Sequence, residues 1–177
     1  MEIFETLNQK SREAGLQFLV MGGHAINAHG YERQTADVDI LVRSKDREAW
    51  KILLSSLGYR VFHEQDTFMQ FSAPEAGAWP VDLMFVNEQT FSKMLAESIE
   101  VTMKGTGVKI PSVEHLIALK LHALKYTNPR RELKDLLDVV SLLEANKIDP
   151  NGGKFKELCE RYGTQKIQNK IIAASSK

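Results

Sequence analysis

The sequence predicts an α/β (α+β) protein in which a small mixed β-sheet is flanked by helices and followed by a helical subdomain. Short apolar runs bounded by glycine, proline or polar residues alternate with helical patterns up to about residue 111, as expected of buried strands joined by helices. After Pro111 the strand signal fades, and apolar residues recur at helical spacing. We therefore predict an α/β core over 1–111 and a helical subdomain over 112–177.

The bulk composition is that of a soluble globular protein. Of 177 residues, 43% are apolar, and the 23 basic residues balance the 23 acidic ones, so no overall field attracts nucleic acid or membrane. The single cysteine, Cys159, excludes an internal disulfide and fits a reducing compartment. The amino end carries acids where a signal peptide has bases, and no apolar run is long enough to cross a bilayer. We expect a cytoplasmic protein.

Glycines, prolines and apolar periodicity place the elements of the core. Trp50, Leu53, Leu54 and Leu57 follow the i, i+3, i+4, i+7 pattern of an amphipathic helix, and Gly58 ends that helix. The expected elements are a helix over 2–14, a strand over 16–21, a helix over 24–29, a strand over 37–42, a helix capped by Ser44, a hairpin of strands 59–62 and 67–72, a strand over 80–86, a helix over 88–97, and a hairpin of strands 99–103 and 108–110 around Gly105-Thr106-Gly107.

The subdomain follows from the same signals. Ser112 is a favourable N-cap for a helix over 113–125, and Pro129 closes the connection to an amphipathic helix over 130–145. Two further helices are expected, one around Phe155–Tyr162 and one over 165–174. Cys159 lies on the apolar side of the first of these, so we expect it in the core.

A glycine pair and an acid pair are the first candidates for chemistry. Gly22 and Gly23 follow a predicted buried strand and allow backbone N–H groups to approach an anion at a helix start; a tight turn without a ligand is the alternative. Asp37 and Asp39 point to one side of a strand, where they repel each other unless a cation lies between them. Mg²⁺ is a suitable cation, because it binds carboxylates together with substrate phosphates. His24 lacks the spacing of a zinc site, and we expect a structural role for it.

Asp82 is the third acid of interest, since it interrupts an otherwise apolar strand over 80–86. A buried carboxylate is costly unless it has a hydrogen-bond partner or a cation. If its strand lies beside the strand of Asp37 and Asp39, three acids converge on one patch, which suits two-metal catalysis. The alternative is an acid on an edge strand that faces solvent.

These motifs resemble those of the DNA polymerase β-like nucleotidyltransferase superfamily. Its signature is an apolar residue, Gly, then Gly or Ser, nine to thirteen residues and an Asp-x-Asp strand; here thirteen residues separate Gly23 from Asp37. Residues 33–40 (Arg-Gln-Thr-Ala-Asp-Val-Asp-Ile) look like the corresponding motif of the minimal and abortive-infection (type IV toxin) nucleotidyltransferases. The stretches 118–124 and 130–138 are similar to their helical motifs. The resemblance implies a nucleotidyltransferase fold whose helical subdomain closes the nucleotide cleft.

The resemblance also implies roles for the acids and glycines of the core. Asp37 and Asp39 would bind two Mg²⁺ ions, for which Mn²⁺ is a substitute. Asp82 would hold the catalytic metal and help to deprotonate the acceptor hydroxyl. Gly22 and Gly23 would bind the phosphates of a nucleoside triphosphate (NTP) through their N–H groups. Many relatives have Ser where this chain has Gly23, so the hydroxyl contact to phosphate is absent.

In the helical motifs, the resemblance assigns Lys120 to the triphosphate and Asp135 to the orientation of Lys120 or of the acceptor. The residues themselves leave alternatives open. Lys120 lies among apolar residues, and packing of its stem along the core is the alternative. Asp135 and Asp138 are candidates for solvent exposure or for pairs within their helix. Arg33 would bind an active-site acid or a phosphate.

The predicted function is the Mg²⁺-dependent transfer of a nucleoside monophosphate from an NTP to a hydroxyl of a tRNA, a protein or a small molecule. A toxin with an antitoxin protein as its partner is one form of this prediction, and an antibiotic adenylyltransferase is another. A non-catalytic nucleotide- or protein-binding module on the same fold is the alternative. Ten basic residues form either a groove for an RNA acceptor or, as we favour, a solvated surface: Lys120, Lys125, Arg130, Arg131, Lys134, Lys154, Lys156, Arg161, Lys166 and Lys170.

Overall fold

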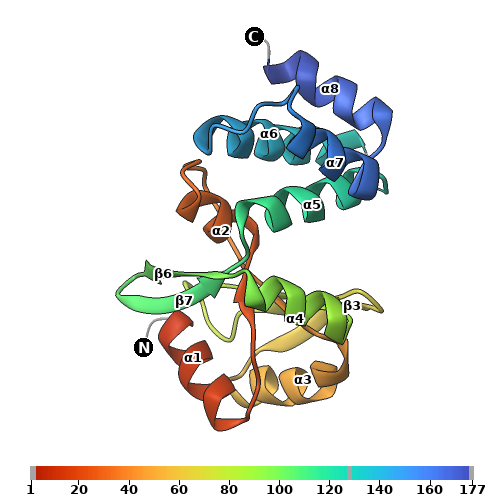
Figure 1. Cartoon of the computed structure of the whole chain (residues 1–177). Coiled ribbons are helices and arrows are strands. Elements are labelled where there is room, and N and C mark those ends of the chain that lie inside the picture. Colours follow the sequence, from red (N-terminus) through yellow and green to blue (C-terminus); the bar gives the residue numbers. More distant parts are fainter. Residues whose placement is uncertain (1–2, 127–128, 176–177) are drawn as a thin grey trace. The chain divides into compact units, whose positions relative to one another are not determined.

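The computed structural model describes residues 3–126 and 129–175 (Figure 1). By its internal contacts the chain forms two compact units: residues 1–25 with 34–111, and residues 26–33 with 112–177. The second unit therefore contains residues 26–33, which a single boundary after residue 111 would assign to the first unit. The division into domains at 1–111 and 112–177 stays a prediction.

The first unit is built on a five-stranded mixed sheet, as the sequence predicts. The strand order is β1-β2-β5-β4-β3; β2 and β5 are parallel, and the other neighbours are antiparallel. Two parallel strands need a long crossover connection. The chain between β2 and β5 contains a helix and a hairpin. The strands are β1 (Leu19–Val20), β2 (Val38–Arg43), β3 (Arg60–Gln65), β4 (Phe68–Ser72) and β5 (Val81–Val86).

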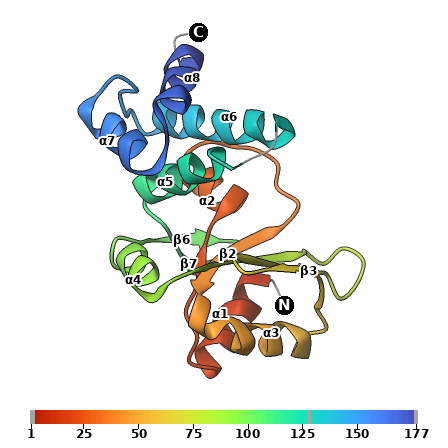
Figure 2. The ribbon, with the colours of Figure 1, turned by 90° about the vertical axis from the view of Figure 1, so that its right-hand side faces the viewer.

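One face of this sheet is the core, and the other carries polar groups. Val38, Ile40, Val81 and Leu83 are buried on the core face, and Figures 1 and 2 show two helices, α1 and α3, on one side of the strands. Strand residues alternate between faces, so the acid of β5 lies on the opposite face. The helices of this unit are α1 (Ile3–Glu13), the first part of α2 (Gly22–Ala28), η1 (Ser44–Asp46), α3 (Arg47–Ser56) and α4 (Glu88–Ala96).

Two local predictions in this unit are wrong. Ser44 does not cap α3, because a 3₁₀ turn begins at Ser44 and α3 begins three residues later, behind Asp46. The second hairpin, β6 (Ile99–Met103) with β7 (Thr106–Ile110), turns at Lys104 and Gly105 rather than at Gly105–Gly107. Met103 pairs with Thr106, so Thr106 and Gly107 belong to the strand.

The second unit is helical. Its helices are α5 (Val113–Leu124), α6 (Pro129–Ala145), α7 (Gly153–Tyr162) and α8 (Gln165–Ser175). Helix α5 packs against α6 and α7, and α8 packs against α6 and α7. The predicted N-cap is confirmed, because the Ser112 side chain accepts a hydrogen bond from the His115 N–H at 3.4 Å. Cys159 is buried as predicted, and burial, followed by the charge of Glu160, raises the pKa of its thiol to about 11.

Residues 26–33 contact α6 within this second unit. The Asn146 side chain donates a hydrogen bond to the His29 carbonyl at 3.0 Å. A Cβ on Gly30 would lie 3.4 Å from the Ala145 side chain. None of the helices described, over 3–126 and 129–175, has the length and apolar character of a membrane span.

Candidate active site

Three carboxylates meet on the polar face of the sheet. Because β2 and β5 run parallel in register, Asp39 lies directly opposite Asp82, and Asp37 immediately precedes β2. One carboxylate oxygen of each residue lies within 4.8 Å of those of the other two. The sequence-based expectation that the strand of Asp82 lies beside that of Asp37 and Asp39 is confirmed, and the edge-strand alternative is wrong.

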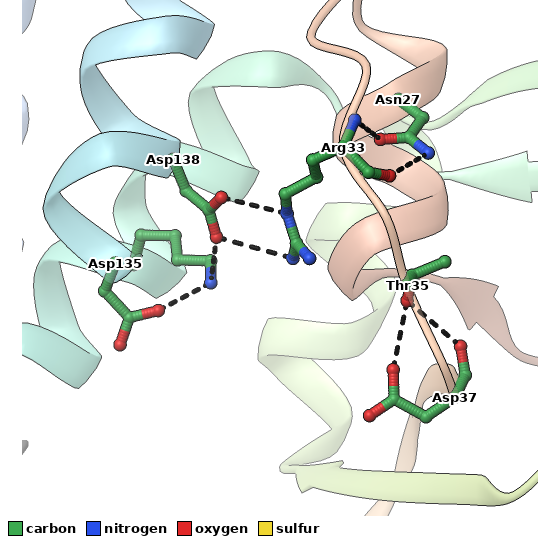
Figure 3. A network of polar contacts seen from close by, with 7 residues as sticks. Asn27, Arg33, Thr35, Asp37, Asp135 and Asp138 are labelled. Carbon is green, nitrogen blue, oxygen red and sulfur yellow. Dashed lines mark hydrogen bonds and ion pairs between the residues drawn. The ribbon is translucent and has the colours of Figure 1, made fainter. Parts of the chain in front are cut away.

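Neighbouring side chains orient two of these carboxylates. The Thr35 hydroxyl donates a hydrogen bond to Asp37 Oδ1 at 3.0 Å (Figure 3). Gln70, the cross-strand partner of Asp82 on β4, donates from Nε2 to Asp82 Oδ2 at 2.6 Å. Such hydrogen bonds are typical of residues that fix the ligands of a metal ion. Sequence reasoning missed Gln70. It is adjacent to the core residue Phe71 and so lies on the opposite face of β4, and only the pairing of β4 with β5 places it across from Asp82.

The carboxylates fit a divalent cation. Like charges directly opposite each other in a sheet repel, and these three side chains are only partly exposed. Two oxygens on opposite sides of one Mg²⁺ ion are about 4.2 Å apart, so a cluster within 4.8 Å needs little adjustment to hold such an ion. The three acids thus form a candidate metal centre made of the hard oxygen ligands that Mg²⁺ and Mn²⁺ prefer.

Gly22 brings the turn after β1 directly against this cluster. Its φ is +59°, and a Cβ at this position would lie 1.7 Å from Asp39 Oδ2. Only glycine therefore fits both the left-handed backbone and the close approach of the carboxylate. Gly23 is the buried second residue of α2.

His24, directly after this glycine pair, is held between two aromatic rings. Its ring centroid lies 5.1 Å from that of Phe4 and 5.0 Å from that of Trp79. Trp79 precedes Pro80, whose carbonyl accepts a hydrogen bond from the Val38 N–H at the start of β2. These contacts fit the structural role predicted for His24.

A second group of charged residues lies in the helical unit. The Lys120 ammonium on α5 is 2.6 Å from Asp135 Oδ1 and 2.7 Å from Asp138 Oδ2. Asp138 also binds Arg33, whose Nε lies 3.0 Å from Asp138 Oδ1 (Figure 3). The Asn27 side chain fixes the backbone of Arg33, accepting from its N–H at 3.0 Å and donating to its carbonyl at 2.9 Å. Two cations and two anions thus form one neutral network.

Burial decides between the alternatives for these acids. Asp135 and Asp138 are 2% and 1% exposed, and the cations that hold them are Lys120 and Arg33. The expectation that these acids are solvated is therefore wrong, and each has a cationic partner outside α6. A spacing of three residues on a helix places Asp135 and Asp138 on one face. This spacing was the sequence signal that could have identified Asp138 as a partner of Lys120.

Part of the predicted basic surface is neutralised. Lys120 is held in the buried network, Lys154 pairs with Glu114, and Lys170 pairs with Glu132. The side chain of Arg130 lies outside the described residues. These pairs fit a solvated surface better than a continuous groove of free positive charge.

A mixed sheet that brings three carboxylates together beside a glycine is the arrangement that the resemblance to nucleotidyltransferases led us to expect. The chain belongs to the family described as "Uncharacterised nucleotidyltransferase", whose model matches residues 1–175. The predicted nucleotidyltransferase family and the assignment as an enzyme are thereby confirmed.

Several solved structures share the fold. An antigenic nucleotidyltransferase-like protein from Paracoccidioides brasiliensis has a TM-score of 0.55 at 18% identity, over 97% of this chain and 91% of that one. The antibiotic-resistance factor ANT(2'')-Ia has a TM-score of 0.58 at 18% identity, over 96% and 87%. The lincosamide antibiotic adenylyltransferase LnuA has a TM-score of 0.57 at 16% identity, over 81% and 95%. No curated protein matches the sequence significantly.

Proposed function

We propose that this protein transfers a nucleoside monophosphate from an NTP to a hydroxyl acceptor, with Mg²⁺ as its cofactor. The observation that carries the proposal is the cluster of Asp37, Asp39 and Asp82 beside the Gly22 turn. In the reaction, the acceptor oxygen bonds to the α-phosphorus, and the bond from that phosphorus to the bridging oxygen breaks. Pyrophosphate leaves, and the hydroxyl proton passes to a base.

The residues of the first unit take these roles in the proposal. Asp37, Asp39 and Asp82 would hold the Mg²⁺ ions, or Mn²⁺ in their place, and Asp82 would accept the proton of the acceptor hydroxyl. Bound ions supply charge neutralisation for the phosphates and activation of the acceptor oxygen. The N–H groups of Gly22 and Gly23 bind the nucleotide phosphates. The hydrogen bond that Gln70 donates to Asp82 supports this assignment, because such a bond fixes the orientation of a metal-binding carboxylate.

The helical unit contributes Lys120 to the triphosphate and Asp135 to the orientation of Lys120. An ammonium group has three N–H donors, and two acids, Asp135 and Asp138, lie within bonding distance of it. For Arg33 we favour the acid-binding alternative over a phosphate contact, because its guanidinium binds Asp138. Arg33 and Asp138 then position Lys120 and do not touch the substrate.

The test uses the purified protein, Mg²⁺, each labelled NTP, and a cell extract divided into RNA, protein and small molecules. One fraction should take up the label, and Asp39→Asn should lower the rate at least a hundredfold. Asp66→Asn, which removes an exposed carboxylate from the β3–β4 turn, is the matched control and should leave the rate unchanged. Equal rates for Asp39→Asn and the wild type would contradict the proposal.

The same experiment distinguishes the acceptors. ANT(2'')-Ia has been solved with adenylyl-2''-tobramycin and LnuA with lincomycin, so an antibiotic-like small molecule is one candidate acceptor. The balanced net charge favours this class over a large RNA surface. Label in tRNA or protein would instead support a toxin, for which an antitoxin protein is the expected partner. Mg²⁺-dependent NTP binding without pyrophosphate release in any fraction would support the non-catalytic module.

A further inference from the structure

A pocket in the first unit shares no residue with the acid cluster. Its volume is about 630 Å³, within the range of small-molecule sites. It is formed by the loop before β5, the start of α1, the end of α3 and the tip of the β6–β7 hairpin. The residues of its lining that matter here are Ile3, Leu57, Tyr59, Glu75, Trp79 and Lys104.

One side of the pocket is aromatic and apolar. Trp79 and Tyr59 line it together with the aliphatic side chains of Ile3 and Leu57. Burial raises the pKa of the Tyr59 hydroxyl, and in its neutral form this group can both donate and accept a hydrogen bond. Such a surface suits a planar ring, because aromatic side chains pack favourably against flat ligands.

The hairpin tip brings a cation to this aromatic side. The Lys104 ammonium lies 5.2 Å from the centre of the Trp79 ring. Lys104 has a φ of +48° and Gly105 a φ of +79°, so the two residues form a turn in which Asn-Gly is the preferred sequence. A lysine at the first position is unfavourable for the backbone, and backbone strain of this kind often accompanies a functional site.

We propose that this pocket binds a small molecule that combines a planar ring with one anionic group. The ring packs against Trp79 and Tyr59, and the anionic group binds Lys104. Aromatic carboxylates and nucleoside monophosphates share this chemistry. The exposed Glu75 carboxylate on the rim disfavours ligands with anionic groups at both ends. The proposal is independent of the nucleotidyl transfer.

The test is ¹⁹F NMR of the full-length protein labelled with 5-fluorotryptophan, in EDTA. The chain has two tryptophans; Trp50 is fully buried in the core and serves as an internal reference, and Trp50→Phe assigns the two signals. 1-Naphthoate and AMP are titrated separately. At least one of the two ligands should shift the Trp79 signal saturably and leave the Trp50 signal in place. A shift with naphthoate only identifies a site for aromatic carboxylates, and a shift with AMP only identifies a site for nucleotides.

Variants test the role of the lysine. Lys104→Asn should weaken binding at least tenfold and leave the melting temperature equal or higher, because asparagine suits the turn. Lys109→Asn, on the same hairpin, should bind as the wild type does, and Lys104→Gln replaces Lys104→Asn if the latter fails to fold. The proposal is overturned if neither ligand shifts the Trp79 signal, if the uncharged 1-naphthalenemethanol binds as tightly as naphthoate, or if loss of the Lys104 charge leaves affinity unchanged.

Discussion

Gly22 leaves the space that the Asp39 carboxylate of the acid cluster occupies. We predict that Gly22→Ala abolishes metal binding, because the new Cβ would occupy the position of the Asp39 carboxylate. The left-handed backbone should cost a further ~1–2 kcal/mol, the penalty for a non-glycine residue in this conformation. Calorimetric titration with Mn²⁺ measures the first effect and urea unfolding the second.

Gly15→Ala is the matched control for this prediction. Gly15 has a similar φ of +68°, but nothing lies within 4 Å of its Cβ position. Gly15→Ala should therefore lower the free energy of unfolding by a similar amount and leave Mn²⁺ binding unchanged. Wild-type Mn²⁺ affinity in Gly22→Ala would show that the Asp39 carboxylate does not need its present position.

Single residues differ in how well the sequence predicts them. The role of Asp82 as a third acid was predictable, because an acid within an apolar strand demands a partner, and two other acids were already on a strand. The partner of Asp138 was not, because Arg33 lies 105 residues away in the chain. Sequence periodicity reports which face a residue occupies and contains no information on what lies opposite that face.

At the scale of elements, the buried network links α5, α6 and the segment after α2. We predict that Asp138→Asn lowers the free energy of unfolding by about 3–5 kcal/mol, the typical cost of removing one partner from a buried ion pair, since Lys120 and Arg33 both lose a counter-charge. Urea unfolding followed by circular dichroism measures this loss.

Glu144→Gln removes an exposed charge from the same helix and should change stability little. A double-mutant cycle sharpens the prediction. Arg33→Met combined with Asp138→Asn should be less destabilising than the sum of the single changes, because the second substitution removes the charge that the first left unpaired. Strict additivity would contradict the coupling.

Element boundaries were predictable where one local signal dominates, and failed where two signals compete. Ser112 caps α5 as expected. Ser44 has the same chemistry, but the chain first makes a 3₁₀ turn and the cap position moves to Asp46. At the β6–β7 hairpin two glycines compete for the turn, and the pairing of Met103 with Thr106 decides in favour of Lys104-Gly105.

At the scale of the whole molecule, the segment 26–33 belongs with helices of which the first, α5, begins at Val113. We predict that residues 112–177 alone form helices without a cooperative unfolding transition, because Asp138 and Asn146 lose Arg33 and the His29 carbonyl. Joining 26–33 to this fragment through a glycine–serine linker should restore a cooperative transition, measured by near-ultraviolet circular dichroism. A cooperative transition in the fragment alone would contradict this.

The fold class could be predicted from the sequence because the strands of the sheet and the helices around it have different hydrophobic patterns. The membership of 26–33 in the helical unit did not, since a seven-residue helix that straddles two units has no distinctive pattern.

The direct pairing of Asp39 with Asp82 also limits how this chain can change in length during evolution. Side chains alternate along a strand, so one residue inserted between Pro80 and Asp82 would turn the carboxylate into the core and bring an apolar side chain to its place. Insertions in the exposed loop of residues 74–77 leave that register intact. Natural length variation among relatives should therefore concentrate in this loop and be absent from the five residues that follow it.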